Sequence, residues 1–188
     1  TQALQDTVAL VTGASSGIGE ATARALAAQG ATVAVVARRK DRLDALAEQI
    51  GGLAIEADVT DREQAAGAVE RTAQALGRLD VVVNNAGVML LGPIVDAPVE
   101  EWDRMVELNL QGLLYVAHAA LPHLLSAAER EPRRVADLVN VSSVAGRRVG
   151  AGGDNCGGIL IGEAAHQAQA EAHGVMLACC DPLQRAVP

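Results

Sequence analysis

A glycine-rich turn near the N-terminus is the first segment of this sequence that could carry chemistry. Residues 12–19 read TGASSGIG and stand between an apolar run and an Ala-rich segment. Glycines let a backbone approach a ligand closely and adopt positive φ angles, and the N-terminus of a helix binds phosphate through free N–H groups and the helix dipole. Because a strand is expected before this turn and a helix after it, we predict that Gly13, Gly17 and Gly19 hold a nucleotide pyrophosphate.

Two arginines follow the next apolar run. Arg38 and Arg39 come directly after residues 31–37, and no Asp or Glu lies between Ala31 and Lys40. In a dinucleotide-binding fold, an acidic residue at this point binds the ribose 2′-hydroxyl group, whereas an arginine accommodates a 2′-phosphate. Guanidinium groups bind phosphate through bidentate, charge-assisted hydrogen bonds. The pair therefore predicts NADP in preference to NAD, with a solvated basic helix start as the alternative.

Residues for acid–base chemistry are harder to find. The sequence has one tyrosine, Tyr115, and one lysine, Lys40, which lie far apart, so a mechanism that needs both within one helical turn has no candidates. The four histidines have no carboxylate partner at an obvious spacing, and we expect them on helix surfaces. Cys156, Cys179 and Cys180 lack CxxC spacing and a histidine at ligand spacing, so we expect no metal site.

The segments that must position these residues alternate between two patterns. Apolar, mainly β-branched runs predict strands, and Ala-rich or amphipathic stretches that end at glycine predict helices. The expected strands are 7–12, 31–37, 53–57, 79–84, 134–142 and 175–180, and the expected helices are 17–29, 41–50, 61–76, 99–128, interrupted at Pro122, and 162–173. Strands that are apolar throughout are typical of parallel sheets covered by helices. The fold class is therefore α/β: a doubly wound parallel sheet of Rossmann type, in three αβα layers.

Composition restricts the class of protein. A length of 188 residues fits one domain, 1–188, and 50% of the residues are hydrophobic, with no Phe. The net charge of −8 argues against a nucleic-acid binder, which needs a basic face. No apolar run approaches the ~18 residues that span a bilayer, and the first residues lack the features of a secretory signal. We expect a cytoplasmic protein with reduced thiols and no membrane partner.

A set of motifs resembles, in order and spacing, those of the short-chain dehydrogenase/reductases. They are TGASSGIG at 12–19, Asp58-Val59, NNAG at 84–87, Asn109 and NVSS at 140–143, and the resemblance runs from residue 5 to residue 149. It implies a Rossmann-type fold that binds NAD or NADP through Gly13, Ser15, Ser16, Gly17, Ile18, Gly19, Arg38, Arg39, Asp58, Val59, Asn85, Ala86 and Gly87. Asp58 would contact the adenine amino group; the alternative for Asp58 is a carboxylate at a helix start.

The resemblance also implies a reaction. Members of the family transfer hydride between a nicotinamide and a small-molecule carbonyl or alcohol. Ser143 matches the serine that orients the substrate oxygen, and Asn109 matches the asparagine that holds a water. The family's acid/base tyrosine and its partner lysine correspond to Cys156 and Leu160. Past these residues the resemblance is partial, and we expect a domain whose C-terminal part is shortened or rewritten.

Three interpretations stay open. The chain is an NADP-dependent oxidoreductase, or a non-catalytic NADP-binding sensor or partner protein, or an altered product that folds poorly. Homo-oligomerisation is expected to use the helix that begins at Val99 and ends at Ala128, and to be weaker than is typical of the family, because the second helix of the usual interface is altered.

Overall fold

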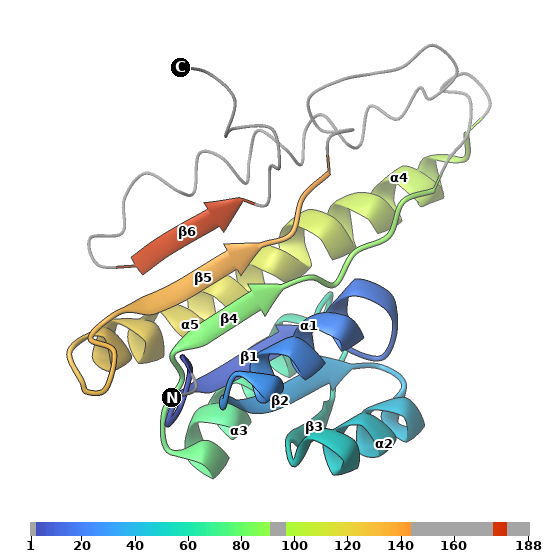
Figure 1. Ribbon diagram of the computed structural model, residues 1–188. Helices are drawn as coiled ribbons and strands as arrows, with labels where there is room; N and C mark the ends of the chain where they lie inside the picture. Colours follow the sequence, from blue (N-terminus) through green and yellow to red (C-terminus); the bar gives the residue numbers. More distant parts are fainter. Residues whose placement is uncertain (1–2, 91–96, 144–174, 180–188) are drawn as a thin grey trace, which may run out of the picture.

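The computed structural model describes residues 3–90, 97–143 and 175–179 (Figure 1). Within these residues six strands form one sheet in the order β3-β2-β1-β4-β5-β6, and every pairing is parallel. The strands are β1 (Val8–Thr12), β2 (Thr32–Ala37), β3 (Leu53–Glu56), β4 (Val81–Asn84), β5 (Ala136–Asn140) and β6 (Val175–Cys179). The expected helix at 162–173, together with Cys156 and Leu160, lies outside the described residues.

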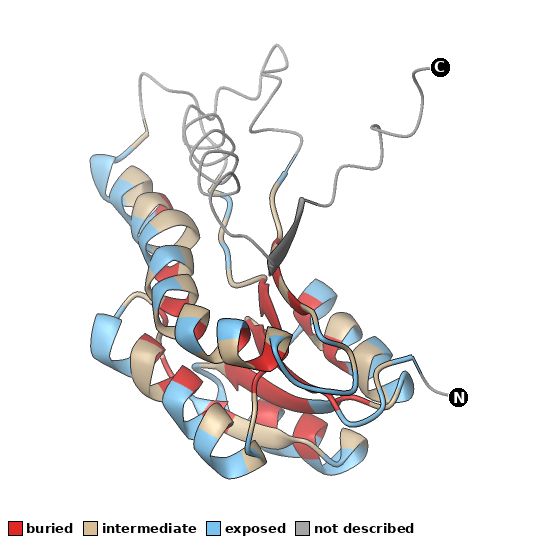
Figure 2. Ribbon diagram, turned by 90° about the vertical axis from the view of Figure 1, so that its left-hand side faces the viewer, coloured by how far each residue is buried: buried red, intermediate tan, exposed pale blue. Residues whose placement is uncertain are grey.

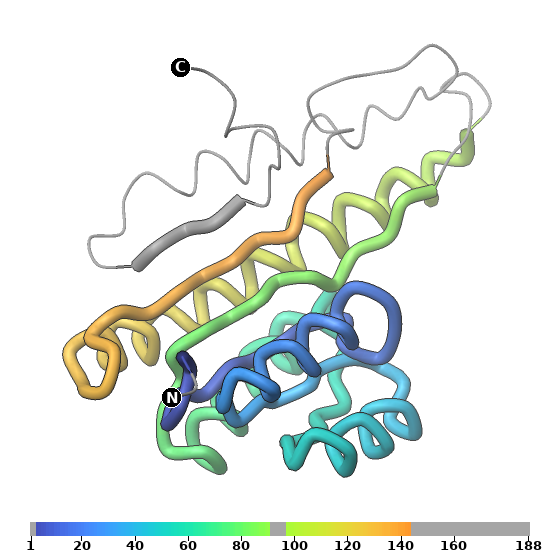
Figure 3. The backbone as a smooth tube through the Cα atoms, in the orientation of Figure 1, coloured from blue at the N-terminus to red at the C-terminus, as the bar shows by residue number. Residues whose placement is uncertain are grey.

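The strand order reverses next to β1. From β1 the chain moves outward through β2 to β3, then returns to the other side of β1 to form β4, and continues through β5 to β6. Figure 3 shows the result, with the blue-to-teal and green-to-orange parts of the chain side by side along the sheet. The carboxyl ends of β1 and β4 therefore meet at a topological switch point, which is where ligands bind in open α/β sheets.

Helices cover both faces of the sheet. They are α1 (Gly17–Ala28), α2 (Lys40–Ile50), α3 (Arg62–Leu76), α4 (Val99–Val106), one π-helical turn η1 (Glu107–Gly112), and α5 (Leu113–Ala128). Buried residues of α1 and α2 pack on one face, and those of α3 and α5 pack on the other. Figure 2 shows the buried strands between helices whose outer faces are exposed. The expected doubly wound sheet in three layers is confirmed.

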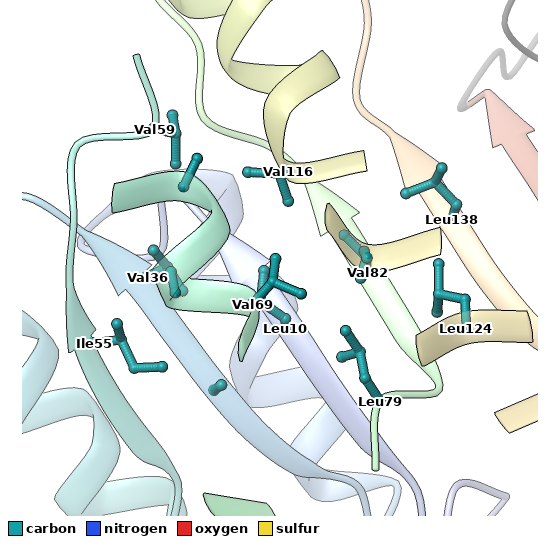
Figure 4. Packing of buried hydrophobic residues seen from close by; sticks show 14 of the residues in the cluster. Leu10, Val36, Ile55, Val59, Val69, Leu79, Val82, Val116, Leu124 and Leu138 are labelled. Carbon is teal, nitrogen blue, oxygen red and sulfur yellow. The ribbon is translucent and has the colours of Figure 1, made fainter. Parts of the chain in front are cut away.

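The core is built from aliphatic side chains, as the lack of phenylalanine requires. On the α3 and α5 face, Leu10, Val36 and Val82 of the strands are buried to 1% exposure or less. Val69 of α3 and Leu124 of α5 pack against them (Figure 4). Since both faces of the central strands are covered in this way, β1 and β2 are apolar along most of their length.

Local signals place the ends of α3. The Asp61 carboxylate accepts hydrogen bonds from the backbone N–H groups of Glu63 and Gln64, both at 2.9 Å. Donation from the Gln64 N–H group holds the pKa of Asp61 below its ordinary value. At the other end, Gly77 takes the left-handed conformation, with φ at 80°. Both ends follow the capping rules for residues of these types.

The long helix differs from its expected form. Pro122 does not interrupt it, because α5 runs through Pro122 to Ala128. Pro122 is exposed, while Val116 and Leu124 on the inner side of the helix are buried. Proline lacks the N–H group for a helical hydrogen bond, and here that missing bond lies on the solvent side of α5. The packing of Val116 and Leu124 against the core, on the opposite side, holds the helix together. The irregularity lies earlier instead, in η1.

One histidine has a carboxylate partner that helical spacing does not reveal. His123 of α5 has its Nε2 atom 2.9 Å from Oε1 of Glu70 on α3. The two residues are far apart in the sequence and meet because α3 and α5 pack side by side. The spacing of residues along the chain could not reveal this partner of His123.

A buried carboxylate joins the amino ends of the strands, at the edge opposite the switch point. Asp80 is fully buried and accepts a hydrogen bond from the backbone N–H of Val8 at 2.8 Å. Arg78 donates to the same carboxylate from Nε at 2.8 Å and also donates to the carbonyl oxygen of Glu131.

Across the described residues, no helix is both long and apolar enough to cross a membrane.

Candidate functional site

A groove of ≈ 410 Å³ opens at the carboxyl edge of the sheet, over the switch point. Its walls come from the turn after β1, the ends of β2 and β3, the loop after β4, and η1. The lining residues are Gly13, Ser15, Ser16, Ile18, Val36, Ala37, Arg38, Arg39, Ala57, Asp58, Val59, Asn85, Ala86, Gly87 and Leu108. The volume is in the usual range for small-molecule and cofactor sites.

Most residues that the sequence predicts for cofactor binding line this groove. Gly17 and Gly19 are exceptions, because they shape the turn without lining the groove. Sequence reasoning missed Val36, Ala37, Ala57 and Leu108. The first three end strands or directly follow them, so strand ends at the carboxyl edge are a signal that could have found them. Leu108 carries no such local signal.

The three glycines of the turn are required for different reasons. Gly13 and Gly17 have φ angles of 66° and 60°, which side-chain-bearing residues rarely adopt. Gly19 is buried, and a Cβ atom there would lie 2.5 Å from the carbonyl oxygen of Gly13. Helix α1 begins at Gly17, with Ser16 as its N-cap residue in an extended conformation. The turn thus brings the N-terminus of α1, which could bind a phosphate group, next to the groove.

Arg39 lies against this turn. Its Nε and Nη2 atoms donate to the Ser15 hydroxyl at 3.1 and 2.8 Å, and Nη2 also donates to the Ser16 hydroxyl at 2.7 Å. The guanidinium group is therefore held at the groove wall beside the start of α1. This arrangement adds side-chain hydrogen bonds between the turn after β1 and the end of β2, and it places a positive charge there.

Arg38 faces Asp58 across the end of the sheet. Its Nη1 atom is 3.6 Å from Oδ2 of Asp58, and the Arg38 side chain is 63% exposed. The other oxygen of Asp58 accepts from the backbone N–H and hydroxyl groups of Thr60, at 3.0 and 2.8 Å. Asp61, three residues later, is the residue that caps α3, and the contact of Asp58 with an adenine stays a prediction. Asp58 fixes the loop after β3.

The ends of β1 and β4 are joined by hydrogen bonds at the switch point. The Thr12 hydroxyl accepts from the backbone N–H groups of Asn85 and Ala86, both at 3.0 Å. The Asn85 side chain donates to the Thr12 carbonyl oxygen at 3.0 Å. One residue earlier, the buried Asn84 donates to the Asn140 amide oxygen at 3.0 Å and so links β4 to β5. These bonds fix the groove floor.

Asn109, on η1, uses both ends of its amide on one residue. Its Oδ1 atom accepts from the backbone N–H of Val88, and its Nδ2 atom donates to the Val88 carbonyl oxygen, both at 2.8 Å. The side chain therefore forms the pair of hydrogen bonds that a neighbouring strand would form with Val88, and it holds the loop after β4 in place. A role for Asn109 with a water stays a prediction.

Ser143 is exposed and follows the end of β5 at Asn140. Because the carboxyl ends of parallel strands lie along one edge, Ser143 is on the groove side of the sheet. Cys156 and Leu160 lie outside the described residues, so the structure does not test their relation to Ser143. In the parts of the chain that the structure describes, no group of three or more His, Cys, Asp or Glu residues could hold a metal ion.

Comparisons with known proteins agree with this geometry. A family model described as short chain dehydrogenase matches residues 7–155. An uncharacterized oxidoreductase of Staphylococcus aureus strain MRSA252 is 40% identical over 149 residues, which are 78% of this chain and 62% of the relative. A similarly described protein of Staphylococcus epidermidis is 39% identical over 145 residues, 76% of this chain and 60% of the relative.

Solved structures show the same likeness. A short-chain type dehydrogenase/reductase from Mycobacterium marinum has a TM-score of 0.79 at 31% identity, over 89% of this chain and 68% of that one. The 3-ketoacyl-(acyl-carrier-protein) reductase from Brucella melitensis, complexed with NADH, has a TM-score of 0.85 at 28% identity, over 94% and 75%. The chain spans 62% of the length of the first curated relatives it matches. On the family model and these relatives together, the chain belongs to the short-chain dehydrogenase/reductase family.

Proposed function

We propose that the groove binds NADP and that the chain is an NADP-dependent oxidoreductase of the short-chain dehydrogenase/reductase type. The observation that carries the cofactor proposal is the position of Arg39, whose guanidinium group is held beside the glycine turn by Ser15 and Ser16. An arginine at this point accommodates a ribose 2′-phosphate. When bound, the cofactor supplies hydride transfer to or from a small-molecule carbonyl or alcohol.

Different parts of the groove would hold different parts of the cofactor. The glycine turn and the N-terminus of α1 would bind the pyrophosphate, and Asp58 and Val59 would border the adenine. Arg39 would be the main ligand of the 2′-phosphate, because Arg38 is more exposed and faces Asp58. The loop at 85–87, with the end of β5 beyond it, would border the nicotinamide half.

A second candidate function is NADP binding without hydride transfer. Cys156 and Leu160 stand where the family has its acid/base tyrosine and the lysine that tunes it. A thiol can donate a proton, with an ordinary pKa near 8.5, but leucine supplies no positive charge to lower it. General acid–base catalysis contributes about 10²–10⁴-fold. This departure favours an NADP-binding sensor or partner protein over a fast enzyme. Ser143 still occupies the position of the family serine that orients the substrate oxygen.

A thermal melt with NADP, paired with an NADPH oxidation assay, separates the candidates. Binding to the native state raises the melting temperature with cofactor concentration. A cofactor-dependent rise with oxidation of NADPH in the presence of small ketones or aldehydes supports the enzyme. The same rise without oxidation supports the sensor. A melt that is not cooperative and does not respond to NADP contradicts both and supports a poorly folding product.

We also propose self-association through the outer side of α4 and α5. Val99, Leu114 and Leu125 are large apolar residues on these helices with exposures of 69%, 44% and 47%. Exposed apolar side chains along one helix favour contact with a second copy. Sedimentation velocity over a range of protein concentrations tests this, with a concentration-dependent dimer expected. A tight tetramer at micromolar concentration contradicts the expectation that the association is weak.

A further inference from the structure

The π-helical turn η1 contacts the groove and the two loops that border the groove. Leu108 lines the groove itself, Asn109 binds the loop after β4, and Gly112 packs against the loop after β3. Single π turns inside α-helices are frequent at functional sites. Here the turn interrupts an otherwise regular helix between α4 and α5 at the level of the groove.

Gly112 is in unusually close contact with Val59. Gly112 is buried, and a Cβ atom built on it would lie 3.1 Å from Cγ2 and 3.2 Å from the carbonyl oxygen of Val59. Carbon atoms in favourable contact are about 3.5–4.0 Å apart. A side chain at position 112 therefore requires η1 and the loop that holds Val59 to move apart by a few tenths of an ångström, because the contacted atoms include the Val59 backbone.

Val59 cannot move without changing the groove. Its side chain is 5% exposed, belongs to the core cluster, and lines the groove next to Asp58. Figure 4 shows Val59 at the same end of the cluster as Val116 of α5. A shift of Val59 away from η1 carries Asp58 with it, since the two are consecutive.

The same turn holds the other groove wall. The Asn109 amide makes both of its hydrogen bonds to Val88. A Cβ atom on Gly87, which lines the groove, would lie 3.1 Å from Oδ1 of Asn109. One helical turn thus sets the positions of two loops that lie on either side of the switch point.

We propose that Gly112 is a positioning residue for the adenosine half of the cofactor. It allows η1 to touch Val59, and this contact sets the distance between the loop after β3 and the loop after β4. The proposal rests on the proposed binding of NADP. The expected consequence is that Gly112→Ala weakens binding, although alanine favours a helix more than glycine does.

The test compares matched glycine-to-alanine changes. Gly67 lies in α3, and a Cβ atom there would meet nothing within 4 Å, so Gly67→Ala is the control. The affinities of wild type and both variants for NADP and for adenosine 2′,5′-bisphosphate are measured by calorimetry. Gly112→Ala is expected to weaken both ligands about ten-fold, and Gly67→Ala to leave both unchanged.

A double-mutant cycle with Val59→Ala distinguishes positioning from a loss of stability. Removing the Val59 methyl groups relieves the contact with Cγ2 and leaves the contacts with the Val59 backbone. Gly112→Ala is therefore expected to cost less affinity in the Val59→Ala variant than in wild type, while keeping part of its cost. If Gly112→Ala alone does not melt cooperatively, recovery of folding and binding in the double variant supports the contact.

Each other outcome has a definite meaning. Wild type that binds neither ligand overturns the proposed function and this proposal with it. Wild type that binds, with Gly112→Ala binding equally well, overturns the positioning role alone. The same holds if Gly112→Ala costs as much affinity with the Val59→Ala change as without it, or if the double variant shows no recovery.

Discussion

Arg39 is hydrogen-bonded to Ser15, with its Nε and Nη2 atoms 3.1 and 2.8 Å from the serine hydroxyl oxygen. An arginine directly after the second strand is thereby held against the glycine turn that follows the first. Because the long Arg39 side chain is already held in place, the entropic cost of ordering it when a ligand binds is lower. The relationship links the predicted pyrophosphate site to the predicted 2′-phosphate site.

Replacing both arginines should separate the two cofactors. Arg38→Ala with Arg39→Ala is expected to lower NADP affinity by several-fold to a hundred-fold, since hydrogen bonds to charged groups contribute about 1.5–3 kcal/mol. NAD affinity should change little, because NAD has no 2′-phosphate. Calorimetry of both cofactors checks this, with Arg42→Ala as the control for removing a nearby exposed positive charge. Equal losses for NADP and NAD would refute the assignment.

The glycine turn can be tested at Gly19. Gly19→Val places a branched side chain against the Gly13 carbonyl and the Asn85 amide, where the backbone of α1 approaches the turn. We expect NADP affinity to fall by at least about ten-fold, because the turn must open to admit the side chain. Titration calorimetry measures the change. Affinity equal to that of wild type would show that the turn does not bind the cofactor.

We expect the buried Asp80 to stabilise the folded chain. Asp80→Ala leaves the Val8 N–H and the largely buried Arg78 guanidinium without their shared acceptor. Removing one partner of a buried ion pair costs about 3–5 kcal/mol. Urea denaturation measures the free energy of unfolding. Asp44→Ala, which breaks an exposed pair with Lys40, is the control and should cost far less, because solvent screens exposed ion pairs. Equal costs for the two changes would contradict a stabilising role for the buried pair.

Much of the fold follows from the sequence. Runs such as 33–37 (VAVVA) are apolar because both faces of the sheet are covered, and glycines such as Gly77 end helices where a left-handed residue is needed. The glycine turn could be predicted as a site because its chemistry is local: a strand, positive φ angles and a helix start.

The features that sequence reasoning missed depend on contacts between distant segments. Leu108 reaches the groove because η1 packs beside two loops, and His123 meets Glu70 because α3 and α5 are neighbours. The helix continues through Pro122 because its inner side is packed and Pro122 faces solvent. None of these relations has a fixed spacing along the chain, so no pattern of residue types reveals them.

The missing acid makes a prediction about rate. As the chain stands, we expect turnover of carbonyl substrates to be very slow, because Cys156 and Leu160 replace the acid/base pair. Cys156→Tyr with Leu160→Lys should raise the rate of NADPH oxidation with small ketones and aldehydes, within the ~10²–10⁴-fold range of general acid catalysis.

Controls for this experiment are the two single substitutions, neither of which restores the pair. Turnover by the unmodified chain near the ~10 s⁻¹ typical of enzymes would show that the argument from the two missing side chains is wrong. If both proteins bind NADP and neither oxidises NADPH, the chain lacks more for catalysis than these two side chains.

The central claim is that the groove at the switch point is an NADP site. Its most direct test is calorimetric titration of the unmodified chain with NADP and with NAD at the same ionic strength. We expect one-to-one binding of both, with NADP bound at least about ten-fold more tightly, because Arg39 is held where a 2′-phosphate would lie. Equal affinity for the two cofactors, tighter binding of NAD, or no binding of either would contradict the claim.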